Sequence, residues 1–391
     1  MTAEHTTYTI RPALLRNLVL VIALGALGSA AGLLLAPVRI WPAILLANYY
    51  IVGLALAGGI FIALTFITRA GWSTVFRRVP EAMTRSLPVS FALMLLTAFG
   101  ISTLYEWSHT SVLAQDHLIA SKAPWLNVPF FVGRIVVFFV IWIGFTAALR
   151  RNSELQDRTG DERLTDRNMR ISALFLVLVA LTIWLASTDW IMSLEAHWFS
   201  TIFGVYHISG ILLTGTAALT ALLIGLKRRG VFGDLIRPDH LHDLGKLMFA
   251  FSTFWMYIWF SQYMLIWYSN IPEETGYYLS RQQGGWLTFT ILNVVFNWLL
   301  PFVALLSARA KRAEGLLLNV SVIILIGHWI DLFWMIAPPF MPDAPSVGLW
   351  EVAPLAAAVA LFLLITLKGL TRKQIVPVQD PTLVESLHYH S

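Results

Sequence analysis

The chain has 391 residues, of which 57% are hydrophobic and 13% are charged, and its mean hydropathy is +0.70. Soluble domains usually carry about 25% charged residues. This composition therefore excludes a water-soluble enzyme, a disordered chain and a nucleic-acid-binding protein with a basic face. Cysteine is absent, which excludes disulfides, cysteine-held Fe–S clusters, cysteine-containing zinc sites and covalently attached c-type haem. The sequence predicts an integral membrane protein.

Ten apolar runs reach the roughly 20 residues that a helix needs to cross a bilayer. The strict alternation of a membrane β-barrel is missing, so we expect an all-α protein. We expect the first run to be a retained helix, because its apolar stretch is too long for a signal peptide. In chain order the predicted spans are 14–36, 43–68, 88–106, 128–149, 170–190, 200–226, 246–270, 285–308, 316–337 and 349–370.

These spans predict one ten-helix membrane domain over residues 1–370 and a polar tail over 371–391. We expect the tail to pack on a partner or to stay mobile. Four crossings return a chain to its starting side, so spans 2–5 (about 43–190) and 6–9 (about 200–337) are expected to form two four-helix bundles, flanked by spans 1 and 10.

The basic residues predict the orientation of the chain. Of its 27 lysines and arginines, 23 fall in the N-terminal segment, in alternate loops and in the tail, including Arg372 and Lys373. The opposite side has only Arg39, Lys122 and Arg281. Cytoplasmic loops of membrane proteins carry an excess of lysine and arginine. Both termini are therefore expected in the cytoplasm.

Six ionisable residues fall within or at the end of the predicted spans, where a charge costs about 2.5–3.5 kcal/mol at the bilayer centre and is usually paired or functional. All six are expected in the outer half of the membrane, whereas the inner half holds no carboxylate. They are Glu106, Arg134, Asp189, His207, His328 and Asp331.

His328 and Asp331 are three residues apart, so they share a helix face. Histidine changes charge near neutral pH, and a neighbouring carboxylate favours its charged form. Three interpretations of the group remain open: a cluster that handles protons or a quinone headgroup, a polar network that only joins helices, and a haem b held by His207 and His328. Arg134, near a helix end, is equally expected to extend its side chain to the surface.

Two further stretches are polar. Span 246–270 carries a seam that includes Tyr257, which predicts either a hydrated path or hydrogen bonds between helices. The segment from Asp189 to Ser200 places Glu195 and His197 between aromatic residues. Such a segment is typical of an interfacial aromatic belt, and its alternative is a docking face for an extracytoplasmic partner.

Three stretches carry a family resemblance. They are WLASTDWIMSLEAHWFSTIFGVYHISG at 184–210, LGKLMFAFSTFWMYIWFSQYMLIWYSNIPEET at 244–275 and GHWIDLFWMIAPP at 327–339. Together they closely resemble the F subunit of bacterial alternative complex III, a quinol:electron-acceptor oxidoreductase. That subunit is related to the membrane anchors of polysulfide-reductase and nitrite-reductase type. The resemblance covers most of the chain in the number and order of spans.

The resemblance implies the two-bundle architecture and a set of partners in a bacterial inner membrane. The implied partners are a companion ten-span quinol-binding subunit, an Fe–S subunit, a multi-haem c subunit, small membrane anchors and lipids. Quinol oxidation in that family is assigned mainly to the companion subunit, and the F subunit is thought to offer a proton path or a second quinone site. Within the matching stretches the candidates are Asp189, Glu195, His197, His207, Tyr257, His328 and Asp331.

The predicted function is therefore that of a membrane subunit of a respiratory or photosynthetic quinol:electron-acceptor oxidoreductase. It would anchor the assembly, carry no covalent cofactor or catalytic redox centre, and conduct protons or contact a quinone such as menaquinone. The first alternative is a self-contained secondary transporter, because ten spans with polar groups near the midplane also suit one. The second is a haem b anchor.

Overall fold

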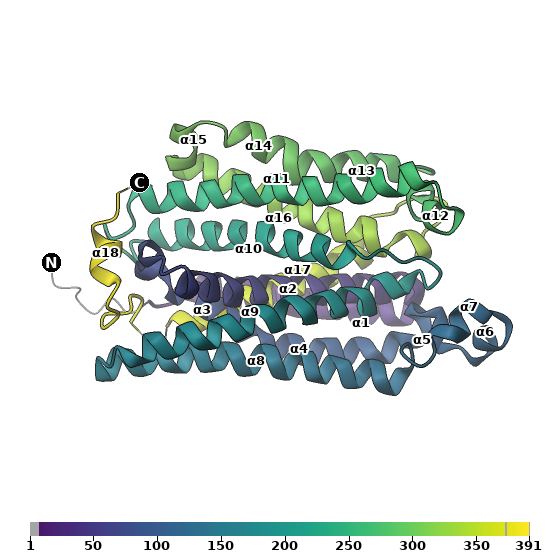
Figure 1. Cartoon of the computed structure of the whole chain (residues 1–391), viewed down its shortest axis with the longest axis horizontal. Helices are drawn as coiled ribbons and strands as arrows, with labels where there is room; N and C mark the ends of the chain where they lie inside the picture. The colour runs from purple at the N-terminus through teal and green to yellow at the C-terminus, as the bar shows by residue number, and fades with distance from the viewer. Residues whose placement is uncertain (1–7, 372–373, 391) are drawn as a thin grey trace.

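The computed structural model describes residues 8–371 and 374–390, so Arg372 and Lys373 lie outside the described residues. Over the described ranges the chain is helical, and no β-strand occurs. Figure 1 shows the long helices lying side by side along one direction. We call the end with α15 (Ala308–Arg312) and α18 (Leu383–Leu387) the tail end. The opposite end, with α6 (Thr110–Gln115), α7 (His117–Lys122) and α12 (Pro272–Ser280), is the cap end.

Nine helical segments of the described chain are long and apolar enough to cross a membrane, as in a multi-pass membrane protein. They are α1 (Pro12–Leu35), α2 (Pro37–Ile67), the stretch Arg78–Leu104 with α3 (Arg78–Met83), α4 (Leu87–Thr97) and α5 (Ile101–Leu104), α8 (Val128–Thr159), the stretch Arg163–Leu194 with α9 (Arg163–Trp190), α10 (Phe203–Lys227), the stretch Trp286–Ala304 with α13 (Trp286–Val294) and α14 (Leu300–Ala304), α16 (Glu314–Ile336) and α17 (Leu349–Leu370).

The predicted span 246–270 corresponds to α11 (Pro238–Ser269), which is long enough to cross but is not one of these nine. Tyrosine, serine, threonine and glutamine residues interrupt its apolar sequence. The count of ten crossings therefore stays a prediction.

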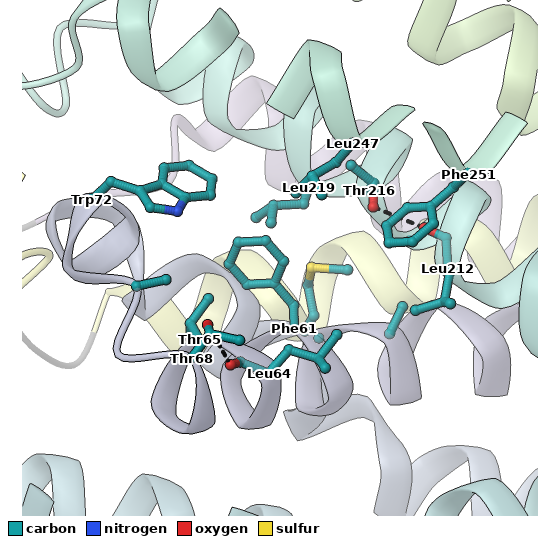
Figure 2. A pocket seen from close by; sticks show the side chains of 15 residues that line it. Phe61, Leu64, Thr65, Thr68, Trp72, Leu212, Thr216, Leu219, Leu247 and Phe251 are labelled. Carbon is teal, nitrogen blue, oxygen red and sulfur yellow. Dashed lines mark hydrogen bonds between the residues drawn. The ribbon is translucent and has the colours of Figure 1, made fainter. Parts of the chain in front are cut away.

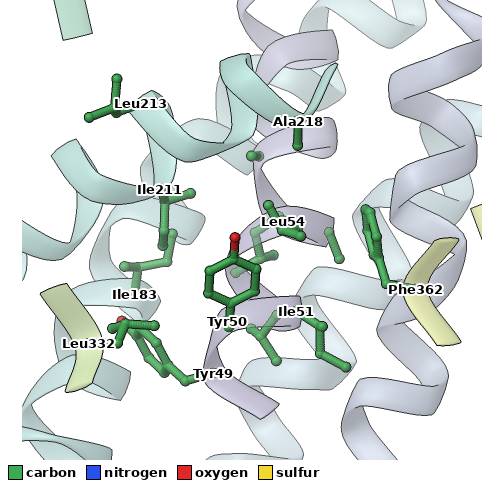
Figure 3. Packing of buried hydrophobic residues seen from close by; sticks show 14 of the residues in the cluster. Tyr49, Tyr50, Ile51, Leu54, Ile183, Ile211, Leu213, Ala218, Leu332 and Phe362 are labelled. Carbon is green, nitrogen blue, oxygen red and sulfur yellow. The ribbon is translucent and has the colours of Figure 1, made fainter. Parts of the chain in front are cut away.

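The centre of the molecule is α2, which contacts α4 and α9 on one side and α10, α16 and α17 on others. Residues along almost the whole length of this helix are buried. Around Tyr49 and Tyr50, Figure 3 shows residues of α9, α10, α16 and α17, such as Ile183, Ile211 and Phe362, packed together. This packing encloses polar side chains in the middle of α2, such as Asn48, Tyr49 and Tyr50.

The pair α1 and α17 packs through small residues. A Cβ atom at Gly25 would lie 2.6 Å from the carbonyl oxygen of Ala353. Such a close approach is possible only without a side chain, as is common where helices associate in membranes. Most of the other face of α1 is exposed in the chain by itself.

The C-terminal segment packs on this chain, so the expectation of a mobile or partner-bound tail is wrong for residues 374–390. Asp380 forms an ion pair with Arg77, and both are buried. The Ser386 hydroxyl donates to the Trp72 carbonyl (2.7 Å), and the ring of His240 hydrogen-bonds the Ser386 carbonyl (3.1 Å). Apolar residues that the tail buries supply the reason. They are Ile375, Val376 and Leu383.

Candidate functional site

A buried carboxyl group, that of Asp331 on α16, lies where four helices meet. It accepts hydrogen bonds from the Tyr206 hydroxyl on α10, from Trp255 Nε1 on α11 (3.2 Å) and from Asn293 Nδ2 on α13 (2.8 Å). Asn297, one turn further along the same segment, donates to Asn293 Oδ1 (2.7 Å) and so fixes that amide. Asp331 is 1% exposed. A group so deeply buried normally needs such partners.

No lysine or arginine of the described chain forms an ion pair with Asp331. Its nearest basic group is His328, whose Nδ1 lies 3.8 Å from Asp331 Oδ2. The two residues face each other as their spacing predicted, but 3.8 Å is longer than a hydrogen bond. Burying an isolated carboxylate is costly, and here three neutral donors offset that cost in place of a cation.

The two histidines lie on adjoining helices, and each has an unused nitrogen. His207 Nδ1 is 3.0 Å from the Tyr49 hydroxyl, while His207 Nε2 is buried without a partner in the described structure. His328 Nδ1 is likewise buried and makes no hydrogen bond. Its ring packs against Tyr50, with the ring centres 5.6 Å apart. We call these two histidines, Asp331 and its three donors the Asp331 cluster. Unpaired buried nitrogens beside a carboxyl are unusual and point to a use.

Haem b does not fit between these two histidines as they stand. A Cβ at Gly210 would lie 3.1 Å from His328 Cε1, so the backbone of α10 packs directly on that ring. His207 is covered by Phe203, with ring centres 4.5 Å apart. The helices are in contact where a porphyrin would need an open slot.

A second buried group is the ion pair of Arg134 and Asp189. Arg134 Nε lies 2.5 Å from Asp189 Oδ2, and Arg134 Nη2 lies 3.0 Å from Asp189 Oδ1. Trp125 Nε1 donates to the same carboxylate (2.9 Å), and its ring lies under the guanidinium at 4.3 Å. Arg134 is 6% exposed, so the alternative that it reaches the surface is wrong. Each of the two charges is neutralised by its partner in the pair, as is typical of a structural ion pair.

Arg281 forms a buried ion pair that was not predicted, because its position between two spans suggested a loop residue. Its guanidinium is fully buried at the cap end and forms an ion pair with Glu195 (2.6 Å). The carbonyl oxygens of Trp334 (3.0 Å) and Met335 (2.9 Å) accept its other protons, and it lies 3.4 Å from the ring centre of Tyr277. Glu195 is therefore bound to a structural arginine. The one signal in the sequence was a single arginine in a loop that is otherwise poor in basic residues.

Three predicted residues lie away from the Asp331 cluster. Glu106 is exposed at the cap end, so its inclusion among the buried ionisable groups is wrong. The span was predicted to reach residue 106, whereas α5 ends at Leu104 and Glu106 lies beyond the end of the helix. His197 is also exposed and pairs with Asp116 (2.6 Å). Tyr257 is 64% exposed on α11, so this member of the polar seam does not face the interior of the chain. Ser252 and Gln262 of the same helix are buried and donate to the Asn297 carbonyl (2.7 Å) and the Ser200 hydroxyl (3.0 Å), as hydrogen bonds between helices require.

The tail end holds a buried carboxylate, Glu81, and a half-buried one, Asp157, that were not predicted. Glu81 and Asp157 both pair with Arg78, and the Arg78–Glu81 distance is 2.5 Å. The predicted span began at residue 88, whereas the helical segment begins at Arg78. Two carboxylates on one buried arginine form an ion network that joins α3 to α8.

Comparison with known proteins gives no assignment. No protein-family model matches the chain, and no curated protein sequence matches it.

Proposed function

We propose that this chain is a cofactor-free membrane subunit of a respiratory or photosynthetic quinol:electron-acceptor oxidoreductase, of the kind of the F subunit of alternative complex III. The position of the three stretches that resemble that subunit supports the proposal. Residues 184–210 supply Tyr206 and His207, 244–275 supply Trp255, and 327–339 supply His328 and Asp331. Segments far apart in the chain thus converge on one buried cluster.

In this proposal the chain crosses a bacterial inner membrane ten times, with α11 as the additional span and both termini in the cytoplasm. The tail end then faces the cytoplasm, which agrees with the basic residues of α15 and of the loop before α11. The cap end faces outward. The partners are the companion quinol-binding subunit, the Fe–S and multi-haem c subunits and the small anchors, and electrons travel on those partners.

The role proposed for the chain within that complex is to hold and pass protons at the Asp331 cluster. One observation carries this role: a buried carboxyl group has three neutral donors and no paired cation. Intramembrane ionisable groups are functional by default. The Asp189 carboxylate has a fixed cationic partner in Arg134, whereas only neutral donors hydrogen-bond the Asp331 carboxyl group.

A proton on Asp331 has a next acceptor within reach. His328 Nδ1 lies 3.8 Å away and is otherwise unpartnered. On the adjoining helix α10, His207 has an unpartnered Nε2, and its Nδ1 lies 3.0 Å from the Tyr49 hydroxyl. Histidine can take a proton on one nitrogen and release it from the other. We propose that these two histidines accept and pass on the proton of Asp331.

The experiment that tests the proton role is the substitution Asp331→Asn in the assembled complex. We expect fewer protons released per electron transferred in proteoliposomes, because the amide cannot take up and release a proton near neutral pH. Glu106→Gln is the matched control, since it removes an exposed carboxyl group and should leave the ratio unchanged. An unchanged ratio in Asp331→Asn would reduce the cluster to a structural network.

The assembly is tested by purification from native membranes. We expect the chain to co-purify with a multi-haem c subunit and an Fe–S subunit, visible as a haem spectrum of the preparation. A stable monomer that binds a solute without haem-bearing partners would instead support the secondary transporter.

A further inference from the structure

An apolar cavity of about 240 Å³ lies between α2, α10 and α11, toward the tail end. Figure 2 shows its lining: Phe61 and Leu64 on α2, Leu212 and Leu219 on α10, Phe251 on α11, and Trp72 in the segment after α2. None of the residues of the Asp331 cluster lines it. An apolar cavity of about 150 Å³ stays dry and takes up an apolar ligand. This larger cavity is therefore suited to hydrocarbon.

The cavity offers nothing for a polar headgroup. Its three threonine hydroxyls each donate to a carbonyl of their own helix: Thr65 to Ile62 (2.9 Å), Thr68 to Leu64 (2.8 Å) and Thr216 to Leu212 (2.8 Å). No charged side chain lines it. A ligand in this cavity is therefore recognised by shape and apolar area alone, and any polar group that it carries must lie outside.

A second cavity, of about 220 Å³, adjoins the first and has the opposite character. The two share Thr65 and Ala70, and the second is lined by Arg69 and Arg77 together with Asp166. The charge of Arg77 is engaged by Asp380. Arg69 is exposed and forms no ion pair within the described part of the chain. Asp166 lines the same cavity, but no ion pair joins it to Arg69 in the described part of the chain. An exposed arginine beside an apolar cavity can bind an anionic headgroup attached to a hydrocarbon chain.

We propose that the two adjoining cavities bind one membrane phospholipid, with an acyl chain in the apolar cavity and the phosphate beside Arg69. A phosphate would use both the positive charge and the N–H donors of Arg69, whereas the neutral headgroup of a quinone would use only the donors. This binding site depends only on the chain lying in a membrane. Its test is therefore independent of the respiratory role proposed above.

The probe is a phosphatidylglycerol that carries a photoactivatable diazirine near the end of one acyl chain. The full chain is reconstituted in phosphatidylcholine nanodiscs with this probe, irradiated and digested, and the labelled peptides are identified by mass spectrometry. We expect label on the peptides that contain Leu64, Leu219 and Phe251. Label spread evenly over the lipid-facing helices would overturn the proposal.

A variant of the apolar lining tests the acyl-chain site. Leu247 is a half-buried residue of this lining. In Leu247→Trp we expect labelling of the cavity to fall about tenfold, because the indole displaces roughly two methylene groups of the lipid. Leu265→Trp, on the exposed outer part of the same helix, should change nothing. Equal labelling in both variants would contradict the proposal.

The headgroup is tested by Arg69→Gln, which lies at the exposed surface and leaves the apolar cavity intact. We expect it to abolish the preference for the phosphatidylglycerol probe over a phosphatidylcholine probe of the same chain. Arg158→Gln, an exposed arginine that lines neither cavity, is its control. A photoactivatable isoprenoid quinone that outcompeted both phospholipids for the same peptides would overturn the assignment.

Discussion

The ion pair of Arg134 and Asp189 gives a prediction that separates structure from proton transfer. Two substitutions, Asp189→Asn and Arg134→Gln, remove one charge each, and the double variant removes both. The pair is buried, bidentate and further held by Trp125, which contacts both partners. Each single variant leaves an uncompensated charge among helices α8 and α9, whereas the double variant leaves none.

The magnitude follows from that geometry. Breaking a buried pair by removing one partner costs about 3–5 kcal/mol. Arg134 keeps the Trp125 carbonyl and two aromatic rings in Asp189→Asn, and such cation–π contacts are worth about 1–2 kcal/mol when desolvated. We therefore expect about 3 kcal/mol of destabilisation for each single variant. For the double variant we expect about 2 kcal/mol, so the coupling energy is about 4 kcal/mol.

The assay is unfolding of the purified chain in mixed micelles, with increasing sodium dodecyl sulfate and tryptophan fluorescence as the readout. Proton transfer by the complex should fall only as far as the amount of folded chain falls. Additive single effects, or a loss of less than about 1 kcal/mol in each, would refute the assignment of a buried ion pair. So would a stable Asp189→Asn variant that had lost proton transfer.

Three further predictions concern other parts of the chain. Asp380→Asn removes the partner of buried Arg77 and should release the tail, seen as faster proteolysis after α17; unchanged proteolysis would contradict the observed packing. Tyr257→Phe should leave proton transfer unchanged, because the hydroxyl is on the outer face of α11; a loss would return Tyr257 to the path. The pKa of Asp116 lies below its ordinary value because backbone N–H groups at the start of α7 and the His197 ring hydrogen-bond its carboxylate. A carboxylate whose pKa is lower in the folded than in the unfolded chain stabilises the fold at any pH above the unfolded pKa. That stabilisation is lost as the pH falls through the folded pKa. The amide groups of α7 should therefore stay protected in hydrogen exchange down to about pH 4 and lose protection only below it. Loss of protection near neutral pH would contradict a lowered pKa of Asp116.

Much of the fold was accessible from the sequence because the bilayer demands long apolar runs. Nine of the predicted spans match apolar helices of the described chain, and the spacing of His328 and Asp331 correctly placed them together. Both features depend on neighbours along one helix. The division into two bundles and the orientation remain predictions.

The rest depends on contacts that the sequence does not show. Two of the carbonyl groups that accept hydrogen bonds from Arg281 belong to α16, more than 50 residues away in the chain. A polar seam on α11 is equally compatible with an inward and an outward face, and packing against α10 turns Tyr257 outward. Asn293, a donor to Asp331, had no feature that distinguished it from other asparagines in spans.

The proton role of Asp331 is tested most directly by infrared difference spectroscopy of the assembled complex during quinol oxidation. We expect a carboxyl C=O band that appears or disappears with turnover. The band should be absent in the Asp331→Asn variant and present in the Glu106→Gln variant. A band that is unchanged in Asp331→Asn, or the absence of any carboxyl change during turnover, would contradict the assignment of Asp331 as a group that takes up and releases a proton.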